Sequence, residues 1–154
     1  MKTTIVFSAV VVLAALGVGS WAAAKYADPP LPSVANPPGS SMEARLHPDQ
    51  QIADTVHRAC YNCHSDQPKV PWYGHLWPSS YFVRNDQMRG MARLNFSEWD
   101  RLGPEMSKIR LMDSCTMMQQ GKMPPWYYTP AHPESHLDAD AVSHFCEWAR
   151  QQPE

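Results

Sequence analysis

The chain has 154 residues, a formal net charge of −2 and 44% hydrophobic residues. Its length corresponds to one compact domain with attached segments, and its composition is that of a globular protein rather than a disordered one. The charge balance argues against a nucleic-acid binder, and four cysteines are too few for a framework of disulfides.

The first 27 residues predict a membrane-directed segment. Residues 5–24 carry no charge and are long enough to span the hydrocarbon layer as a helix. Their strongly apolar part ends at Leu16, and Ala22-Ala23-Ala24 offers a cleavage site of the kind found in export signals. Residues 1–27 are therefore a signal peptide or an N-terminal membrane anchor. Either one places the rest of the chain in the periplasm or on the outer face of the cytoplasmic membrane.

Residues 28–45 are predicted to form a proline-rich linker. Five prolines lie between residues 28 and 40, and they favour an extended, semi-rigid spacer. The folded domain is expected to start near Leu46 and to comprise residues 46–154.

The sequence Cys60-Tyr61-Asn62-Cys63-His64 is a C-x-x-C-H pentapeptide, the attachment signature of a c-type haem. Two thiols at this spacing at the end of a helix can add to the two vinyl groups of one porphyrin. The adjacent imidazole then becomes an axial iron ligand. The pentapeptide predicts one covalently attached haem c, bound through Cys60, Cys63 and His64.

Three alternatives to haem use the same cysteines. A dithiol redox motif normally follows a strand in a βαβ unit, and none is visible here. A zinc site could combine Cys60 and Cys63 with Cys115 and Cys146, but it would leave His64 unexplained. A disulfide between Cys60 and Cys63 would be strained.

The sixth iron position is assigned to Met123. A helix is expected from about Pro104 to Gln120, and Gly121 can end it in a left-handed conformation. Pro124 and Pro125 then stiffen the backbone directly after the methionine, as a weak sulfur ligand requires. Packing in the core is the alternative role of Met123. The competing ligands are His75, His132 and His136.

Cys115 and Cys146 are expected to form a disulfide in an oxidising compartment, with two buried free thiols as the alternative. The disulfide would join the helix before Met123 to a terminal helix from about Asp138 to Gln151. Four arginines are candidates for pairing with haem propionates, although such residues more often form a solvated face: Arg84, Arg89, Arg93 and Arg101.

The stretch from Cys60 to about Trp148 resembles the haem-binding domain family of exported bacterial mono-haem c-type cytochromes. The resemblance rests on several motifs: Cys60-Tyr-Asn-Cys-His-Ser, Pro71-Trp-Tyr, Leu94-Asn-Phe-Ser-Glu-Trp99, Met123-Pro-Pro-Trp-Tyr-Tyr and His132-Pro-Glu. It implies a small helical domain with one haem, often preceded by a hydrophobic segment. The Cys115–Cys146 pair and the methionines around Arg89 depart from the usual pattern.

The predicted fold is all-α, with four or five short helices around one covalent haem, like a small c-type cytochrome. The expected function is one-electron transfer rather than enzyme catalysis, because two filled axial positions leave no iron site for a substrate. The partners would be exported or membrane-bound redox proteins. The alternatives are a haem enzyme or gas or redox sensor with an open distal site, and an accessory haem subunit of a larger membrane complex.

Overall fold

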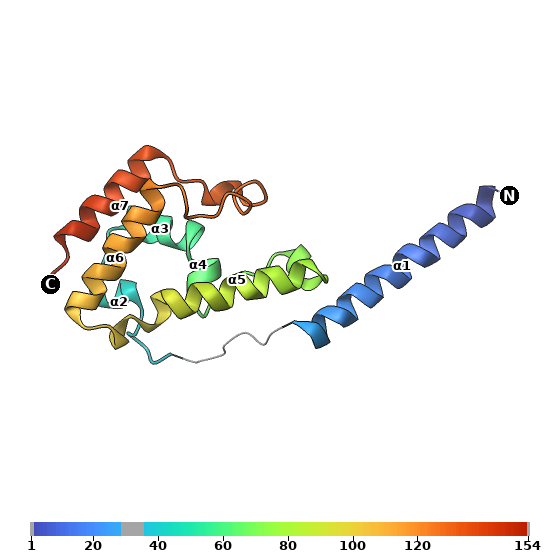
Figure 1. Ribbon diagram of the computed structural model, residues 1–154, viewed down its shortest axis with the longest axis horizontal. Helices are drawn as coiled ribbons and strands as arrows, with labels where there is room; N and C mark the ends of the chain where they lie inside the picture. Colours follow the sequence, from blue (N-terminus) through green and yellow to red (C-terminus); the bar gives the residue numbers. More distant parts are fainter. Residues whose placement is uncertain (1, 29–35, 154) are drawn as a thin grey trace.

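The computed structural model describes residues 2–28 and 36–153. These residues form seven α-helices and three short 3-10 helices, and no strand occurs among them, so the all-α prediction is confirmed (Figure 1). The α-helices are α1 (Lys2–Ala27), α2 (Met42–Leu46), α3 (Gln50–Ala59), α4 (Tyr61–His64), α5 (Ser79–Arg93), α6 (Pro104–Gln119) and α7 (Ala139–Gln151). The 3-10 helices are η1 (Trp72–His75), η2 (Phe96–Arg101) and η3 (Pro133–Ser135).

Helix α1 extends away from the remainder of the protein (Figure 1). Its segment Ile5–Tyr26 is long and apolar enough to cross a membrane, with a mean hydropathy of 2.2. Bulky apolar side chains such as Phe7 and Leu13 are exposed. A spanning anchor and an export signal share these properties, so both interpretations of this segment remain consistent with the fold.

The C-terminal end of α1 contacts the start of α5. The backbone N–H of Trp77 donates to the carbonyl of Ser20 at 3.3 Å, and the Ser20 hydroxyl donates to the carbonyl of Trp77 at 2.6 Å. Asp28 lies 3.3 Å from Arg84, and its carboxylate is almost completely buried. These contacts hold the end of α1 against the folded domain.

The folded domain begins earlier than the sequence analysis places it. Residues 29–35 of the predicted linker lie outside the described residues, but Met42 is fully buried and belongs to the hydrophobic core. The Ser40 hydroxyl also donates to the carbonyl of Ser97 at 2.8 Å. Packing therefore starts near Ser40 rather than Leu46, because the Met42 side chain fills core space.

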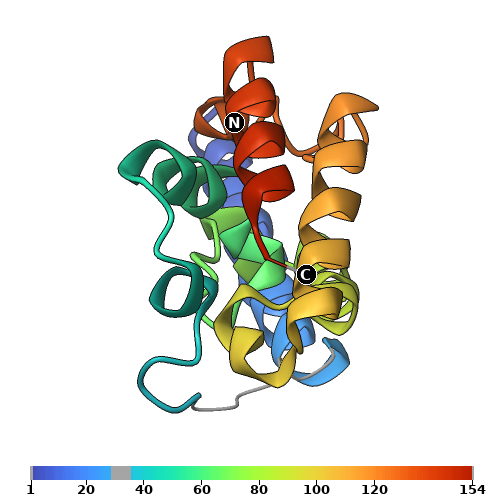
Figure 2. The same ribbon diagram turned by 90° about the vertical axis from the view of Figure 1, so that its left-hand side faces the viewer.

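Helices α3, α6 and α7 enclose the core. Figure 2 shows α7 beside α6, with α3 on the other side of α7. Ile52 and Val56 of α3 meet Leu111 of α6 and Phe145 of α7 in one buried cluster. The helices outnumber the four or five expected, because the chain breaks at Cys60 between α3 and α4 and adds the short α2.

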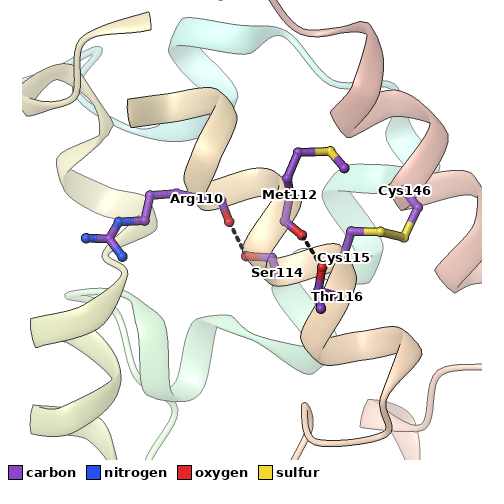
Figure 3. Close-up of a disulfide and its surroundings, with 6 residues drawn as sticks. All are labelled: Arg110, Met112, Ser114, Cys115, Thr116 and Cys146. Carbon is purple, nitrogen blue, oxygen red and sulfur yellow. Dashed lines mark hydrogen bonds between the residues drawn. A yellow bond between two sulfur atoms is a disulfide. The ribbon is translucent and has the colours of Figure 1, made fainter. Parts of the chain in front are cut away.

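A disulfide joins Cys115 of α6 to Cys146 of α7, as predicted (Figure 3). Both residues are buried, with their Cα atoms 5.1 Å apart. The alternative of two free thiols is wrong. The bridge fastens the terminal helix to the helix that leads into the Met123 loop.

Candidate functional site

The Cys60–His64 segment forms one tight turn at the end of α3. The Cys60 N–H closes α3 by donating to Val56 at 2.9 Å, and the Cys60 carbonyl then accepts from the N–H groups of Cys63 and His64. Both cysteines are unbridged and partly buried. The turn therefore holds two free thiols and one imidazole together.

The two thiols are protonated at neutral pH. Burial raises the pKa of Cys60 to about 12, with a smaller contribution from the nearby Cys63. Burial likewise raises the pKa of Cys63 to about 11. A redox-active dithiol has a lowered thiol pKa, so this environment argues against that alternative. The zinc alternative is contradicted directly, because Cys115 and Cys146 form a disulfide with each other.

His64 presents one defined tautomer. Its Nδ1 lies 3.0 Å from the carbonyl oxygen of Leu94, which can only accept, so Nδ1 carries the proton and donates. Burial lowers the pKa of His64, and the bond to Leu94 only partly opposes this effect. The ring is therefore neutral, and its Nε2 keeps the lone pair that an iron or other metal ion binds.

Gly90 of α5 brings that helix into direct contact with the turn. A Cβ atom on Gly90 would overlap the carbonyl oxygen of Cys63 and would lie 3.0 Å from its carbonyl carbon. Only a residue without a side chain allows this approach. The contact positions α5 so that Leu94, just after its end, reaches His64.

An apolar cavity of about 280 Å³ lies beside the turn. Cys60 and His64 line it from the turn, and Met117, Met118 and Met123 line it from α6 and the loop that follows. The cavity wall thus combines a free thiol, a neutral imidazole and a thioether.

The Met123 loop is fixed by the end of α6. Gly121 has a φ of +63°, the left-handed conformation predicted from the sequence. The N–H groups of Lys122 and Met123 both donate to the Met117 carbonyl, at 2.9 and 3.2 Å. Met123 is 37% exposed and lines the cavity that His64 lines. Its role as the sixth ligand stays a prediction.

A second hollow of about 370 Å³ lies beside Cys63. Cys63 lines it together with Tyr73, Phe82, Tyr127 and Tyr128. The Cys60–His64 turn therefore has one hollow beside each of its two thiols. Tyr73, Tyr127 and Tyr128 belong to the Pro71-Trp-Tyr and Met123-Pro-Pro-Trp-Tyr-Tyr motifs of the sequence analysis.

The competing histidines do not line either hollow. His132 is buried, with Nε2 2.6 Å from the Tyr73 hydroxyl and Nδ1 3.2 Å from a Glu134 oxygen, so both ring nitrogens have partners. Its ring stacks on Tyr128, with centroids 4.0 Å apart. His75 and His136 are exposed. Met123, and none of the three competing histidines, therefore lines the cavity that His64 lines.

The candidate arginines divide into two groups. Arg84 pairs with Asp28, and Arg101 pairs with Glu98 on the surface. Arg89 is exposed and lines neither hollow. Arg93 lines the first cavity, and so does Arg110, which the sequence analysis missed. Figure 3 shows the Arg110 side chain extending from α6 on the side away from the disulfide. Its spacing from Ser114 and Met117 along α6 is the helical signal that could have identified it.

Comparisons with known proteins agree with this geometry. A family described as the haem-binding domain matches residues 22–151, which is most of the chain. No curated protein and no solved structure shows significant similarity to the chain.

Proposed function

This chain belongs to the haem-binding domain family, and on that premise we propose that it is a mono-haem c-type cytochrome that carries single electrons on the exported side of a membrane. The observation that carries the proposal is the Cys60–His64 turn, where two free thiols and a neutral imidazole adjoin an apolar cavity.

The chemistry of this turn supports covalent attachment. Addition of a thiol to a vinyl group requires an unbridged cysteine, and Cys60 and Cys63 are both unbridged. Each thiol borders its own hollow, so a flat macrocycle fixed at both would have apolar and aromatic walls around it. The residues present therefore fit a haem c.

His64 and Met123 are the proposed axial ligands. The Leu94 carbonyl holds the His64 proton on Nδ1, which leaves Nε2 for iron and increases its basicity. Met123 lines the same cavity as His64 and lies 59 residues later in the sequence. A thioether ligand favours ferrous iron compared with a second imidazole.

Two arginines are the proposed partners of the propionates. Arg93 is the last residue of α5 and Arg110 lies in the middle of α6, and both line the first cavity. Guanidinium groups bind carboxylates in a bidentate manner, which suits this role.

Bound haem supplies a one-electron redox centre. The residues of this chain would limit it to electron transfer by keeping other ligands away from the iron. Occupation of both axial positions by His64 and Met123 would exclude a substrate from the iron. The methionine-rich wall of the cavity would keep water away from it. An electron carrier is thus favoured over a haem enzyme or sensor, and the redox partner would itself be exported or membrane-bound.

We also propose that α1 is retained as an anchor. The family match begins at residue 22, before the end of the Ala22–Ala24 cleavage site. Ala24 is buried, and Ser20 and Asp28 bond to the folded domain. Cleavage after Ala24 would remove the contacts of Ser20, so these bonds support a retained helix.

Substitution of Met123 tests the axial assignment. The ferric protein should be low-spin, with the weak long-wavelength absorption band that a methionine–iron bond produces. Met123→Ala should lose that band and bind added cyanide or imidazole faster. Met106→Ala is the matched control, because Met106 is exposed on α6 and does not line the cavity. A high-spin ferric spectrum of the unaltered protein would instead support an enzyme or sensor with an open distal site.

A further inference from the structure

Exposed aromatic side chains gather at one end of the domain. They are Trp72, Trp77, Tyr81, Phe82 and Trp126, here called the aromatic end, and Trp72 and Trp126 are 77% and 81% exposed. They come from η1 and the residues after it, from the start of α5 and from the loop after α6. The Tyr127 hydroxyl donates to Asp86 of α5 at 3.0 Å, which ties that loop to α5.

The aromatic end adjoins the C-terminal part of α1. In Figure 1, the start of α5 and the loop between α6 and α7 lie at the end of the domain toward α1. The paired hydrogen bonds between Ser20 and Trp77 place the segment between η1 and α5 beside the last turns of α1. Within α1 itself, the Lys25 ammonium group lies 4.4 Å from the Trp21 ring centroid.

The length of α1 sets the depth of this contact in a membrane. The 22 residues Ile5–Tyr26 extend about 33 Å as a helix, compared with a hydrocarbon layer of about 30 Å. Ser20 lies six residues before Tyr26, or about 9 Å along the axis. A spanning α1 would therefore place the Ser20–Trp77 contact about 9 Å inside the end of the apolar segment, on the acyl-chain side of the boundary between hydrocarbon and headgroups.

Tryptophan and tyrosine are the residues that prefer this boundary. Their rings combine an apolar body with a polar N–H or O–H group, which can bond to headgroups while the ring contacts acyl chains. Three tryptophans and a tyrosine among the five residues of the aromatic end match that preference.

From these observations we infer that the aromatic end lies at the boundary between hydrocarbon and headgroups of the phospholipid bilayer that α1 spans. This inference rests on the proposed retention of α1 as an anchor. Phe82 belongs to the aromatic end and also lines the second hollow beside Cys63. The cysteine edge of the haem site is thereby held at the membrane surface, where it meets membrane-bound redox partners.

Lipid photolabelling of the full haem-loaded chain tests this inference. The protein is reconstituted in phosphatidylcholine vesicles that contain a phospholipid with a diazirine at the boundary of headgroup and acyl chain. After irradiation, mass spectrometry of proteolytic fragments locates the lipid adducts. Adducts are expected in α1 and in the fragments that contain residues 72–82 and 126–127, whereas the exposed apolar Met106 and Ile109 of α6 remain unlabelled.

Two double variants make the test specific. Trp72→Ser with Trp126→Ser should reduce the adducts on the neighbouring Tyr81 and Phe82, because the two most exposed rings no longer hold this surface in the lipid. Met106→Ser with Ile109→Ser is the matched control and should keep them. Haem content and labelling of α1 should be the same in both, which separates loss of membrane contact from misfolding or loss of the anchor.

The remaining outcomes overturn the inference in distinguishable ways. Adducts in α1 alone would show that the aromatic end stands clear of the lipid or is covered by a protein, while the anchor is retained. Equal labelling of α6 would show that the contact is not confined to the aromatic end. Absence of adducts everywhere, with the protein outside the vesicles, would overturn the proposed anchor as well.

Discussion

The backbones of Gly90 and Cys63 touch, so that a Cβ atom on Gly90 would overlap the Cys63 carbonyl oxygen. This contact joins α5 to the turn that carries both thiols and the proposed axial imidazole. It also positions the Leu94 carbonyl, which accepts from His64 at 3.0 Å. Gly90 therefore determines how closely α5 approaches the Cys60–His64 turn.

Gly90→Ala should destabilise the protein by about 1–3 kcal/mol, because the added methyl group forces α5 away from a backbone that cannot yield. An exposed helical glycine would show the opposite effect, since alanine favours the helix by up to about 1 kcal/mol. Thermal and denaturant unfolding provide the measurement. Arg89→Ala, at the neighbouring exposed position of α5, is the control and should change stability little. Equal stability of Gly90→Ala and the parent protein would show that this contact is not required.

Removal of the Cys115–Cys146 disulfide should lower the free energy of unfolding by about 3 to 4 kcal/mol, because the bridge restricts a long loop in the unfolded chain. The double variant Cys115→Ala and Cys146→Ala is compared with the parent in denaturant unfolding. A reductant should destabilise the parent and leave the double variant unchanged. A response of the double variant to reductant would mean that other thiols are responsible.

The Asp49 carboxylate is expected to make the free energy of unfolding depend on pH. Its carboxylate accepts from the N–H of Ile52 at 2.9 Å at the start of α3, and this bond lowers the pKa of Asp49. Because the pKa of Asp49 is lower in the folded protein than its value of 3.8 in the unfolded chain, the carboxylate stabilises the fold at pH values above 3.8. This stabilisation is lost as the pH falls through the folded-state pKa.

Asp49→Ala should therefore cost about 1 kcal/mol at neutral pH, and its difference from the parent should shrink below about pH 4. Asp49→Asn caps the helix without titrating, so its difference from Asp49→Ala should stay constant with pH. Unfolding measured from pH 7 to pH 3 provides both comparisons. A parent–alanine difference that does not shrink in acid would contradict the prediction.

Arg110→Gln should lower the reduction potential of the bound haem. A cation at the cavity wall disfavours ferric iron more than ferrous iron, so its removal stabilises the ferric state. Redox titration measures the change. Arg101→Gln is the matched control, because Arg101 is exposed and pairs with Glu98 outside both hollows. An unchanged or higher potential in Arg110→Gln would remove this residue from the haem environment.

The elements that the sequence predicted are those with local signals. The C-x-x-C-H spacing, the position of Gly121 after α6 and the start of the terminal helix near Asp138 all depend on neighbours within a few residues. The terminal helix expected from about Asp138 to Gln151 is present as α7, Ala139–Gln151. These features form from short-range bonds and could be predicted without the fold.

Contacts between distant segments could not be predicted in this way. The contact of Gly90 with Cys63 depends on how α5 crosses α4, and a helical glycine carries no sequence signal for such a crossing. The bond between His132 and Tyr73 joins residues 59 positions apart. Arg110 lies on a helix that looked like ordinary core, and Met42 lies in what looked like a linker, so their positions emerged only from the packed structure.

The central claim is that Cys60 and Cys63 hold one haem through thioether bonds. Intact mass spectrometry of the denatured chain, together with extraction in acidic acetone, tests it most directly. The chain should keep its pigment in the acid solvent and carry the mass of one haem, and Cys60→Ala with Cys63→Ala should lose both. Pigment that passes into the acetone, or a denatured chain without the mass of haem, would contradict the account.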